Sequence, residues 1–294
     1  MAARSVVIHA DDLGMCRGAN DAFAELSAFG TVTSGSVMVP CPWFSDLAAK
    51  ACATPALDVG VHLTLTSEMP GYRWRPLTHP PKSAGLTDEL GFFHPDVATL
   101  RRKAQPEAVA AELTAQIEAA LAAGIDVTHL DDHMGAVLAP EFIDIYLGLA
   151  VDFGLPPVIC DAPSAYGGLH NLSGIAENAF AATAARARAV GFEIFARIAE
   201  TDWTRTGPAD AAARAMIEGL PRGLSFLALH MTRPGEIALI DPATHHIRTD
   251  EYEVYRDPGF ARWLKTADVA QIGMRELRDS WRARHVNGGK RGTA

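Results

Sequence analysis

The residues best suited to chemistry are carboxylates and imidazoles that follow short apolar runs. Asp11 and Asp12 stand side by side at the end of the run that begins at Val6. His62 lies within VGVHLTL, and VTHLDDH carries His129, Asp131, Asp132 and His133. Adjacent carboxylates repel each other unless a cation or a proton relieves the repulsion. Because two imidazoles and one carboxylate are a common ligand set for divalent ions such as Zn²⁺, these residues point to a metal site.

Each of these residues has a simpler interpretation when it is taken alone. A histidine inside an apolar run, such as His62, is more often a hydrogen-bonded core residue than a ligand. Paired aspartates after a strand commonly form a turn or cap a helix, because Asp accepts hydrogen bonds from free N–H groups. The joint pattern favours chemistry, since four apolar runs end in Asp or His, the last of them at His230.

Strands and helices must position these side chains. Along the sequence, short apolar runs alternate with longer segments of helical periodicity. Strands are expected at 6–10, 31–39, 57–65, 126–130, 156–160, 193–198 and 224–230, and helices at 18–29, 43–53, 106–123, 140–153, 175–191, 208–219 and 274–284. The clearest helix begins at Pro106, where a missing N–H costs nothing, and ends before Gly124. Strands that alternate with helices predict parallel pairing through crossover helices.

The fold class expected from this order is α/β, a single TIM-like (β/α) barrel of seven or eight strands. The sequence lacks the glycine-rich loop of dinucleotide-binding open sheets, which favours a closed barrel. In a barrel the carboxyl ends of all strands share one face, where the Asp and His residues would converge. We expect one domain over residues 1–284 and a flexible tail over 285–294. The irregular segments 66–105 and 161–174 are candidate functional loops. The pair at 245–246 (HH) is expected in a late, solvated loop.

Composition narrows the class of protein. The chain has 294 residues, of which 48% are hydrophobic, and its formal net charge of -9 argues against a nucleic-acid partner. The four cysteines show no CxxC spacing, so no disulfide framework is expected. No apolar stretch approaches the roughly 20 residues that span a bilayer, and no signal peptide is recognisable, so a cytoplasmic location is expected. Ala-rich helical faces could pack against a second copy, which makes a homodimer a further expectation.

Taken together, the motifs resemble the YdjC-like carbohydrate deacetylase family. The matching pieces are HADDLG, TVTSGSVMVPCP, LDVGVHLTLTSE, VTHLDDHMG and, more loosely, LALHMTRPGE, in the family's order over roughly residues 6–236. The resemblance implies a (β/α) barrel that carries one divalent metal ion. It also implies hydrolysis of the N-acetyl group of a small acetylated sugar or a glycolipid head group, with release of acetate.

The resemblance also implies roles for single residues. Asp12, His62 and His133 would hold the metal ion. Asp11 would be the general base and His230 the general acid. This ligand set suits Zn²⁺, and it also accepts Mg²⁺, Mn²⁺ or Co²⁺.

Substrate contacts and two rival functions stay open at this point. Trp74, Tyr72 and Tyr166 lie in the irregular segments and are candidate stacking surfaces for a sugar, although such rings also pin loops to a fold. A metal-dependent phosphoesterase would need a phosphate clamp, such as Arg73 and Arg75, or a second ion. A barrel without catalysis would bind a sugar unchanged, but the joint presence of base and ligands argues against that.

Overall fold

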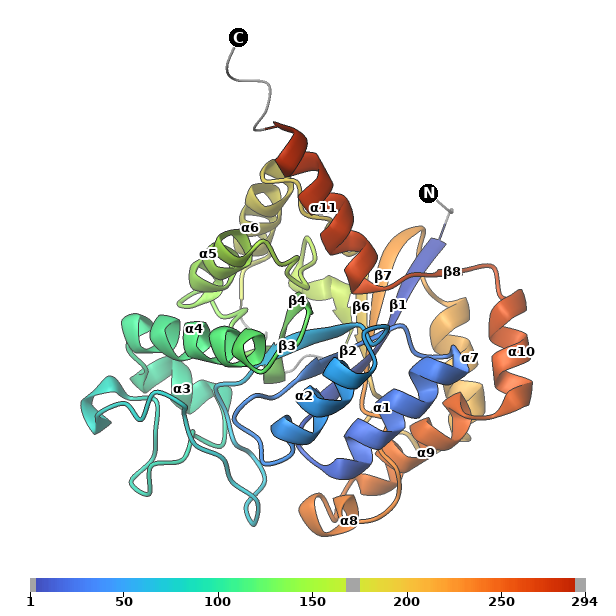
Figure 1. Cartoon of the computed structure of the whole chain (residues 1–294), viewed down its shortest axis with the longest axis horizontal. Coiled ribbons are helices and arrows are strands. Elements are labelled where there is room, and N and C mark those ends of the chain that lie inside the picture. The colour runs from blue at the N-terminus through green and yellow to red at the C-terminus, as the bar shows by residue number, and fades with distance from the viewer. Residues whose placement is uncertain (1–3, 168–174, 289–294) are drawn as a thin grey trace.

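The computed structural model describes residues 4–167 and 175–288, which form a parallel α/β fold (Figure 1). The paired strands run in the order β4-β3-β2-β1-β7-β6-β5, with β8 beside β1. The strands are β1 (Arg4–Leu13), β2 (Ser34–Val37), β3 (Val59–Leu63), β4 (Val127–Asp132), β5 (Tyr166–Gly167), β6 (Arg197–Glu200), β7 (Gly223–Leu229) and β8 (Ala270–Gln271). The predicted parallel sheet is confirmed.

Helices lie outside these strands (Figure 1). They are α1 (Arg17–Phe29), α2 (Phe44–Ala53), α3 (Val97–Lys103), α4 (Pro106–Ala122), α5 (Ile143–Phe153), α6 (Glu177–Ala189), α7 (Ala209–Glu218), α8 (Ile237–Ile240), α9 (His245–Tyr255), α10 (Pro258–Thr266) and α11 (Met274–Gly288). Three short 3₁₀ turns are η1 (Lys82–Ala84), η2 (His133–Gly135) and η3 (Pro163–Ala165). All helices expected from the sequence are present with shifted ends.

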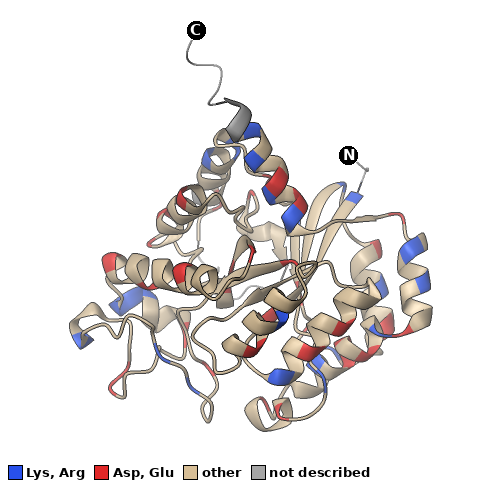
Figure 2. Ribbon diagram, in the orientation of Figure 1, with Lys and Arg blue, Asp and Glu red and all other residues tan. Residues whose placement is uncertain are grey.

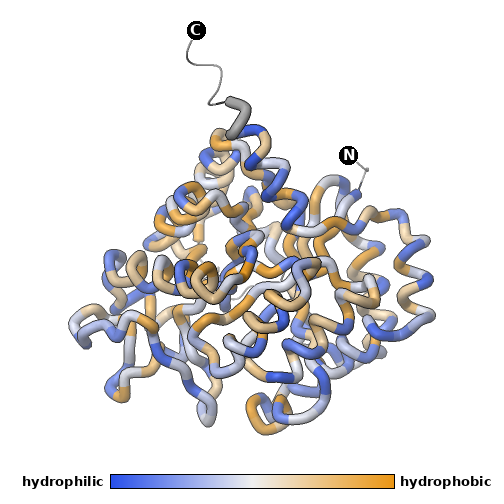
Figure 3. Tube along the Cα trace, in the orientation of Figure 1, coloured by the Kyte–Doolittle hydropathy of each residue, from blue (hydrophilic) through white to orange (hydrophobic). Residues whose placement is uncertain are grey.

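The centre of the fold is β1, which pairs along its length with β7 and by its carboxyl half with β2. Val6, Val7 and Ile8 are completely buried. A continuous apolar run is what a parallel strand covered on both faces requires. Lys, Arg, Asp and Glu lie mainly on the outer helices and loops (Figure 2), while hydrophobic segments run through the interior (Figure 3). The buried carboxylates of the sheet are therefore exceptions that need a reason.

The expected strand at 156–160 is not a strand of the sheet. It makes single bridges instead, from Pro157 to Leu130 of β4 and from Cys160 to Phe195. Consecutive prolines at the start of this segment remove two N–H donors, so a full ladder cannot form. A closed barrel stays a prediction.

Other elements were not expected from the sequence. The irregular segment 66–105 contains η1 and α3, and β5 lies in the second irregular segment, whose residues 168–174 fall outside the described residues. The prediction of a loop at 245–246 is wrong, because these histidines begin α9. That helix buries Ile247 and Tyr252 among mostly polar neighbours, which hides its periodicity.

The last helix extends into the predicted tail. Helix α11 runs to Gly288 and so includes the first part of the predicted tail, while residues 289–294 lie outside the described residues. No helix in the described part of the chain is both long and apolar enough to cross a membrane. The single domain over 1–284 stays a prediction.

Candidate metal centre

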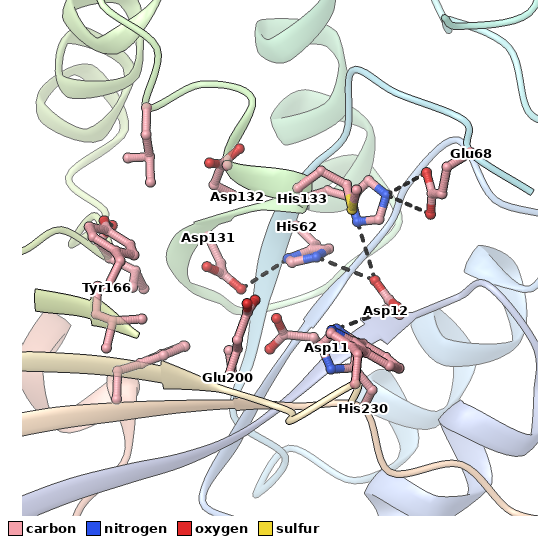
Figure 4. A pocket seen from close by; sticks show the side chains of 18 of the residues that line it. Asp11, Asp12, His62, Glu68, Asp131, Asp132, His133, Tyr166, Glu200 and His230 are labelled. Atoms are coloured by element: carbon pink, nitrogen blue, oxygen red, sulfur yellow. Dashed lines mark hydrogen bonds and ion pairs between the residues drawn. The ribbon is translucent and has the colours of Figure 1, made fainter. Parts of the chain in front are cut away.

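The carboxyl ends of β1, β3 and β4 bring the predicted ligands together (Figure 4). Asp12 lies near the end of β1, His62 lies in β3, and His133 follows β4 directly. Register pairs His62 with Asp131, so the imidazole of β3 lies beside a carboxylate of β4. Residues separated by more than a hundred positions in the chain meet because neighbouring parallel strands end on one edge.

Asp12, His62 and His133 form a buried group of three candidate ligand atoms within 4.8 Å of one another. Oδ1 of Asp12 lies 3.5 Å from Nε2 of His62 and 3.3 Å from Nδ1 of His133. This Oδ1 is buried and has no hydrogen-bond partner among the described residues. A buried carboxylate oxygen without a partner is costly, and a cation there would relieve the cost. The nitrogen and oxygen donors therefore fit a divalent ion.

A backbone irregularity lets both adjacent aspartates face the same cavity. Successive side chains of an extended strand point to opposite faces. The pairing of β1 with β2 shifts register between Ala10 and Leu13, and Asp12 has a φ of 57°, in the left-handed region. A bulge of this kind re-aims a side chain, and Asp tolerates a positive φ better than most residues. Asp11 and Asp12 consequently both line the cavity.

Two further carboxylates fix the ligand imidazoles from behind. Nδ1 of His62 lies 2.9 Å from Oδ2 of Asp131, and Nε2 of His133 lies 3.1 Å from both carboxylate oxygens of Glu68. A partner on one ring nitrogen determines the tautomer and the orientation of the other. Nε2 of His62 and Nδ1 of His133 are thereby left facing Asp12. Glu68 lies in the irregular segment 66–105 and ends the motif LDVGVHLTLTSE, but the sequence indicated no role for it.

The charges around this group shift the pKa values of its members. Burial by itself would lower the pKa of His133, but the nearby carboxylates of Glu68 and Asp12 raise it to about 9. Burial likewise opposes protonation of His62, yet the neighbouring Asp131 holds its pKa well above the usual value. Burial would raise the pKa of Asp12, but Arg248 together with the neighbouring imidazoles of the site holds that pKa well below its usual range. Without a cation, this site is a carboxylate that attracts protons to two imidazoles.

Cation affinity should therefore increase with pH. A cation needs the lone pair on Nδ1 of His133, and that nitrogen is mostly protonated below the raised pKa of about 9. Each proton displaced makes the affinity increase about tenfold per pH unit below that value. Titration calorimetry of the metal-free protein at pH 6, 7 and 8 measures this directly. An affinity that stays constant over this range would contradict the protonated state described above.

The proposed general base lies beside this group but outside it. Oδ1 of Asp11 lies 2.5 Å from Nδ1 of His9, and the residue lines the cavity next to Asp12. Burial, reinforced by the charge of Asp131, raises the pKa of Asp11 well above its usual value. Without a cation this carboxyl group therefore tends to hold a proton. It would act as a base only in its ionised form, which a cation beside it would favour.

His230 reaches the same centre from the end of β7. Its Nε2 lies 3.7 Å from Oδ2 of Asp12, and its Nδ1 lies 2.8 Å from the hydroxyl of Thr201. The ring packs against Trp203, with centroids 4.6 Å apart. Burial is the main reason that the pKa of His230 falls to about 3, so the imidazole is neutral near pH 7. A neutral ring must first gain a proton before it can donate one to a leaving group.

Arg248 is a site residue that the sequence did not reveal. From α9, its Nη1 donates to Oδ2 of Asp12 at 2.8 Å, and its Nε donates to Oδ2 of Asp241 at 3.3 Å. The guanidinium also lies over the ring of Trp203, 4.8 Å from the centroid. Arg248 therefore occupies the second oxygen of Asp12 and leaves Oδ1 for the imidazoles. No strand end marks its position, so the pattern that found the other residues could not find this one.

The site opens into a cavity of about 350 Å³. One end of the cavity holds the Asp and His residues described above. Glu200 lies between that end and an apolar wall (Figure 4). The apolar wall consists of Leu138, Val158, Tyr166, Ile198 and Phe226. This size and mixture are typical of small-molecule sites.

The predicted aromatic contacts lie in different places. Tyr166 lines the cavity. Trp74 is 3% exposed and lies behind His133, with ring centroids 6.2 Å apart and its Nε1–H donated to a main-chain oxygen. Tyr72 donates its hydroxyl hydrogen to the main-chain oxygen of Met15. Neither Trp74 nor Tyr72 is among the residues that line the cavity, so both hold the irregular segment against the site, and their contact with a sugar stays a prediction.

The predicted phosphate clamp also lies away from the cavity lining. Arg73 pairs with Asp88, and Arg75 donates to the main-chain oxygen of Leu90. Both guanidinium groups lie over the ring of Phe92. These contacts are local to the irregular segment.

Comparisons with known proteins agree with this picture. A family model described as YdjC-like protein matches residues 5–266. A Thermus thermophilus protein named carbohydrate deacetylase is 43% identical over 156 residues, which is 53% of each chain. A Brevibacillus brevis protein of the same name is 34% identical over 151 residues, 51% of this chain and 57% of the relative. The matches thus span about half the length of these curated relatives.

One solved structure is similar over most of the chain. It is a crystal structure from Enterococcus faecalis, described as that of a candidate cellobiose-phosphate cleavage protein. The TM-score is 0.74 at 19% identity, and the match covers 93% of this chain and 98% of the other. At this identity, the likeness concerns the fold alone.

Proposed function

The chain belongs to the YdjC-like family, and from that premise we propose that it is a metal-dependent deacetylase. Its substrate would be a small acetylated amino sugar or a glycolipid head group, and its products would be acetate and the free amine. The observation that carries the proposal is the orphaned, buried Oδ1 of Asp12 facing His62 and His133 at the end of a cavity of small-molecule size. The names of the relatives support the choice of reaction.

We propose that Asp12, His62 and His133 hold one divalent ion, Zn²⁺ or Mg²⁺, with Mn²⁺ and Co²⁺ as alternatives. When bound, such an ion supplies Lewis-acid polarisation of the acetamide carbonyl and lowers the pKa of water. Glu68 and Asp131 keep the two imidazoles in the tautomers that this role requires.

Asp11 and His230 would carry the protons. The ionised carboxylate of Asp11 takes a proton from the attacking water while the oxygen of that water bonds to the carbonyl carbon. The bond between that carbon and the amide nitrogen then breaks, and the nitrogen leaves as an amine after it receives a proton. His230 would deliver this proton after it has taken one up from water in the cavity, and Asp12, 3.7 Å from its Nε2, would stabilise the charged ring.

The cavity suits a monosaccharide or disaccharide better than a long polymer, because about 350 Å³ lies at the small end of ligand sites. Tyr166 offers a ring face within it. Tyr72 and Trp74 would reach a sugar only through the loop that they support. We also infer that the single bridges of segment 156–160 close the sheet into a (β/α) barrel within one domain, since they join β4 to the chain before β6. A cytoplasmic location and a homodimer complete the proposal.

Acetate release tests the proposed reaction. Purified protein is stripped of metal and then supplied with Zn²⁺, Mg²⁺, Mn²⁺ or Co²⁺ in the presence of N-acetylglucosamine or its disaccharide. We expect acetate with at least one cation, and one ion per chain by elemental analysis. Two ions per chain with phosphate release from a sugar phosphate would favour the phosphoesterase instead. Sugar binding without any acetate would favour a non-catalytic barrel.

A further inference from the structure

A buried chain of hydrogen bonds leads from Asp11 away from the cavity. Nδ1 of His9 lies 2.5 Å from Oδ1 of Asp11, and Nε2 of His9 lies 3.0 Å from Nε2 of His129. Nδ1 of His129 lies 2.9 Å from the hydroxyl of Thr128. That hydroxyl donates to Oδ1 of Asp58 at 2.6 Å. All five side chains are buried, so water does not compete along this path.

Asp58 forms the far end of this hydrogen-bonded path. It precedes β3, at the end of the strands opposite the cavity, and it does not line the cavity. Besides Thr128, it accepts hydrogen bonds from the Ser34 hydroxyl at 3.0 Å and from the main-chain N–H of Arg275, at the start of α11, at 2.7 Å. Three donors around one carboxyl group are what an ionised carboxylate requires. Asp58 is therefore a fixed acceptor.

Because Asp58 accepts, every hydrogen bond along the path has a defined donor and acceptor. The Thr128 hydroxyl has a single hydrogen, which it donates to Asp58, so it must accept from Nδ1–H of His129. Burial lowers the pKa of His129 to about 3 and that of His9 to about 4, so both rings are neutral. Neutral His129 then accepts at Nε2 from Nε2–H of His9. Nδ1 of His9 therefore accepts from the carboxyl group of Asp11, which agrees with the raised pKa of Asp11.

Packing leaves the two rings no alternative position. The His9 and His129 rings meet edge to face, with centroids 5.1 Å apart, and His9 also packs on Phe226 at 4.6 Å. A Cβ at Gly60 would lie 2.4 Å from the His129 ring, so only glycine there admits the imidazole. In the sequence, His9 and His129 each stand two positions before an aspartate, and nothing there indicates that the two rings meet.

We propose that Asp58, acting through Thr128, His129 and His9, is a positioning residue for the Asp11 carboxyl group. The proposal rests on the proposed function in so far as Asp11 is the base. It adds that the orientation of this base is set from the opposite end of the sheet, through a path that does not include the metal ligands. A general base misplaced by even a small distance loses much of its effect, so the link should be visible in the rate.

Thr128 offers a matched pair of variants. Thr128→Val keeps the shape of the side chain and removes the hydroxyl, whereas Thr128→Ser keeps the hydroxyl. Ser34→Ala is the control, because Ser34 donates to the same oxygen of Asp58 but is not on the path to Asp11. We expect Thr128→Val to lower kcat about tenfold, with KM and cation affinity unchanged, a loss in the range known for residues that orient catalytic groups. Thr128→Ser should restore kcat, and Ser34→Ala should leave it unchanged.

A second measurement is independent of activity. Long-range ¹H–¹⁵N spectra of histidine-labelled protein report which ring nitrogen carries the hydrogen. We expect His129 as the Nδ1–H tautomer in the wild type, and we expect Thr128→Val to shift the ring resonances of His9 as well. If the wild type releases no acetate, the proposed function fails, and these spectra alone test whether the hydrogen-bonded path exists. The inference is overturned if the His9 resonances do not move, or if Ser34→Ala lowers kcat as much as Thr128→Val does.

Discussion

Asp11→Asn should lower kcat for acetate release by about 10²–10⁴-fold, the range in which a general base contributes. Asparagine has the size of aspartate but cannot take a proton from water. Asp11 lies beside the three candidate ligand atoms without being one of them, so the variant should bind the divalent cation as tightly as the wild type. The expected signature is a large loss of rate at unchanged metal affinity.

Steady-state kinetics with titration calorimetry measure both quantities on the same preparation. Asp132→Asn is the matched control, because Asp132 also lines the cavity and is also part of a pair of adjacent aspartates. An asparagine at 132 keeps an oxygen for the hydrogen bond from the main-chain N–H of Val137, and Asp132 belongs to neither group of candidate ligand atoms among the described residues. Asp132→Asn should therefore lose much less activity than Asp11→Asn. Full activity in Asp11→Asn would remove Asp11 from the role of base.

His62→Asn should abolish cation binding at working concentrations. The change removes Nε2, one of the three candidate ligand atoms, and leaves Asp131 without its imidazole partner. Loss of a residue that merely orients a ligand already costs about 10–100-fold in affinity, so loss of the ligand itself should cost at least about 100-fold. Activity should disappear with the cation. A thermal melt gives a further reading, since a cation that binds only the folded state increases Tm in the wild type and should not do so in the variant.

His94→Asn is the control for this prediction. His94 is a buried histidine in the irregular segment 66–105, where it contacts the main-chain oxygen of Gly85, and it does not line the cavity. This variant should retain the cation-dependent increase in Tm even if its own stability falls. Equal loss of cation binding in both variants would mean that the loss reflects general damage to the fold.

The proximity of the three candidate ligands was predictable because each of them lies where a strand ends. Asp12, His62 and His133 each lie at or near the end of an apolar run, and parallel pairing turns that shared position into spatial proximity. The order of strands and helices predicted this convergence without exact boundaries, whereas the choice of these three residues as ligands came from the family resemblance and stays a prediction. The bulge that turns Asp12 toward the cavity could not be foreseen, because it depends on a single shift of register between β1 and β2.

The residues that support the triad could not be predicted in the same way. Glu68 lies in a segment without periodicity, and Arg248 lies in a helix whose polar residues mask its buried face. Both act through long-range packing, which local patterns do not encode. Tyr72 and Trp74 were predicted as sugar-contacting rings from their residue type. In the structure both donate to main-chain oxygens within the irregular segment or beside it, and their contact with a sugar stays a prediction.

A crystal of the protein grown with a divalent cation, with anomalous data collected at the absorption edge of that metal, tests the central claim most directly. We predict one anomalous peak per chain, about 2.0–2.2 Å from Oδ1 of Asp12, Nε2 of His62 and Nδ1 of His133. A fully loaded crystal with no peak at these three atoms, or with its only peak between Asp11 and Asp131, would contradict the metal centre proposed here.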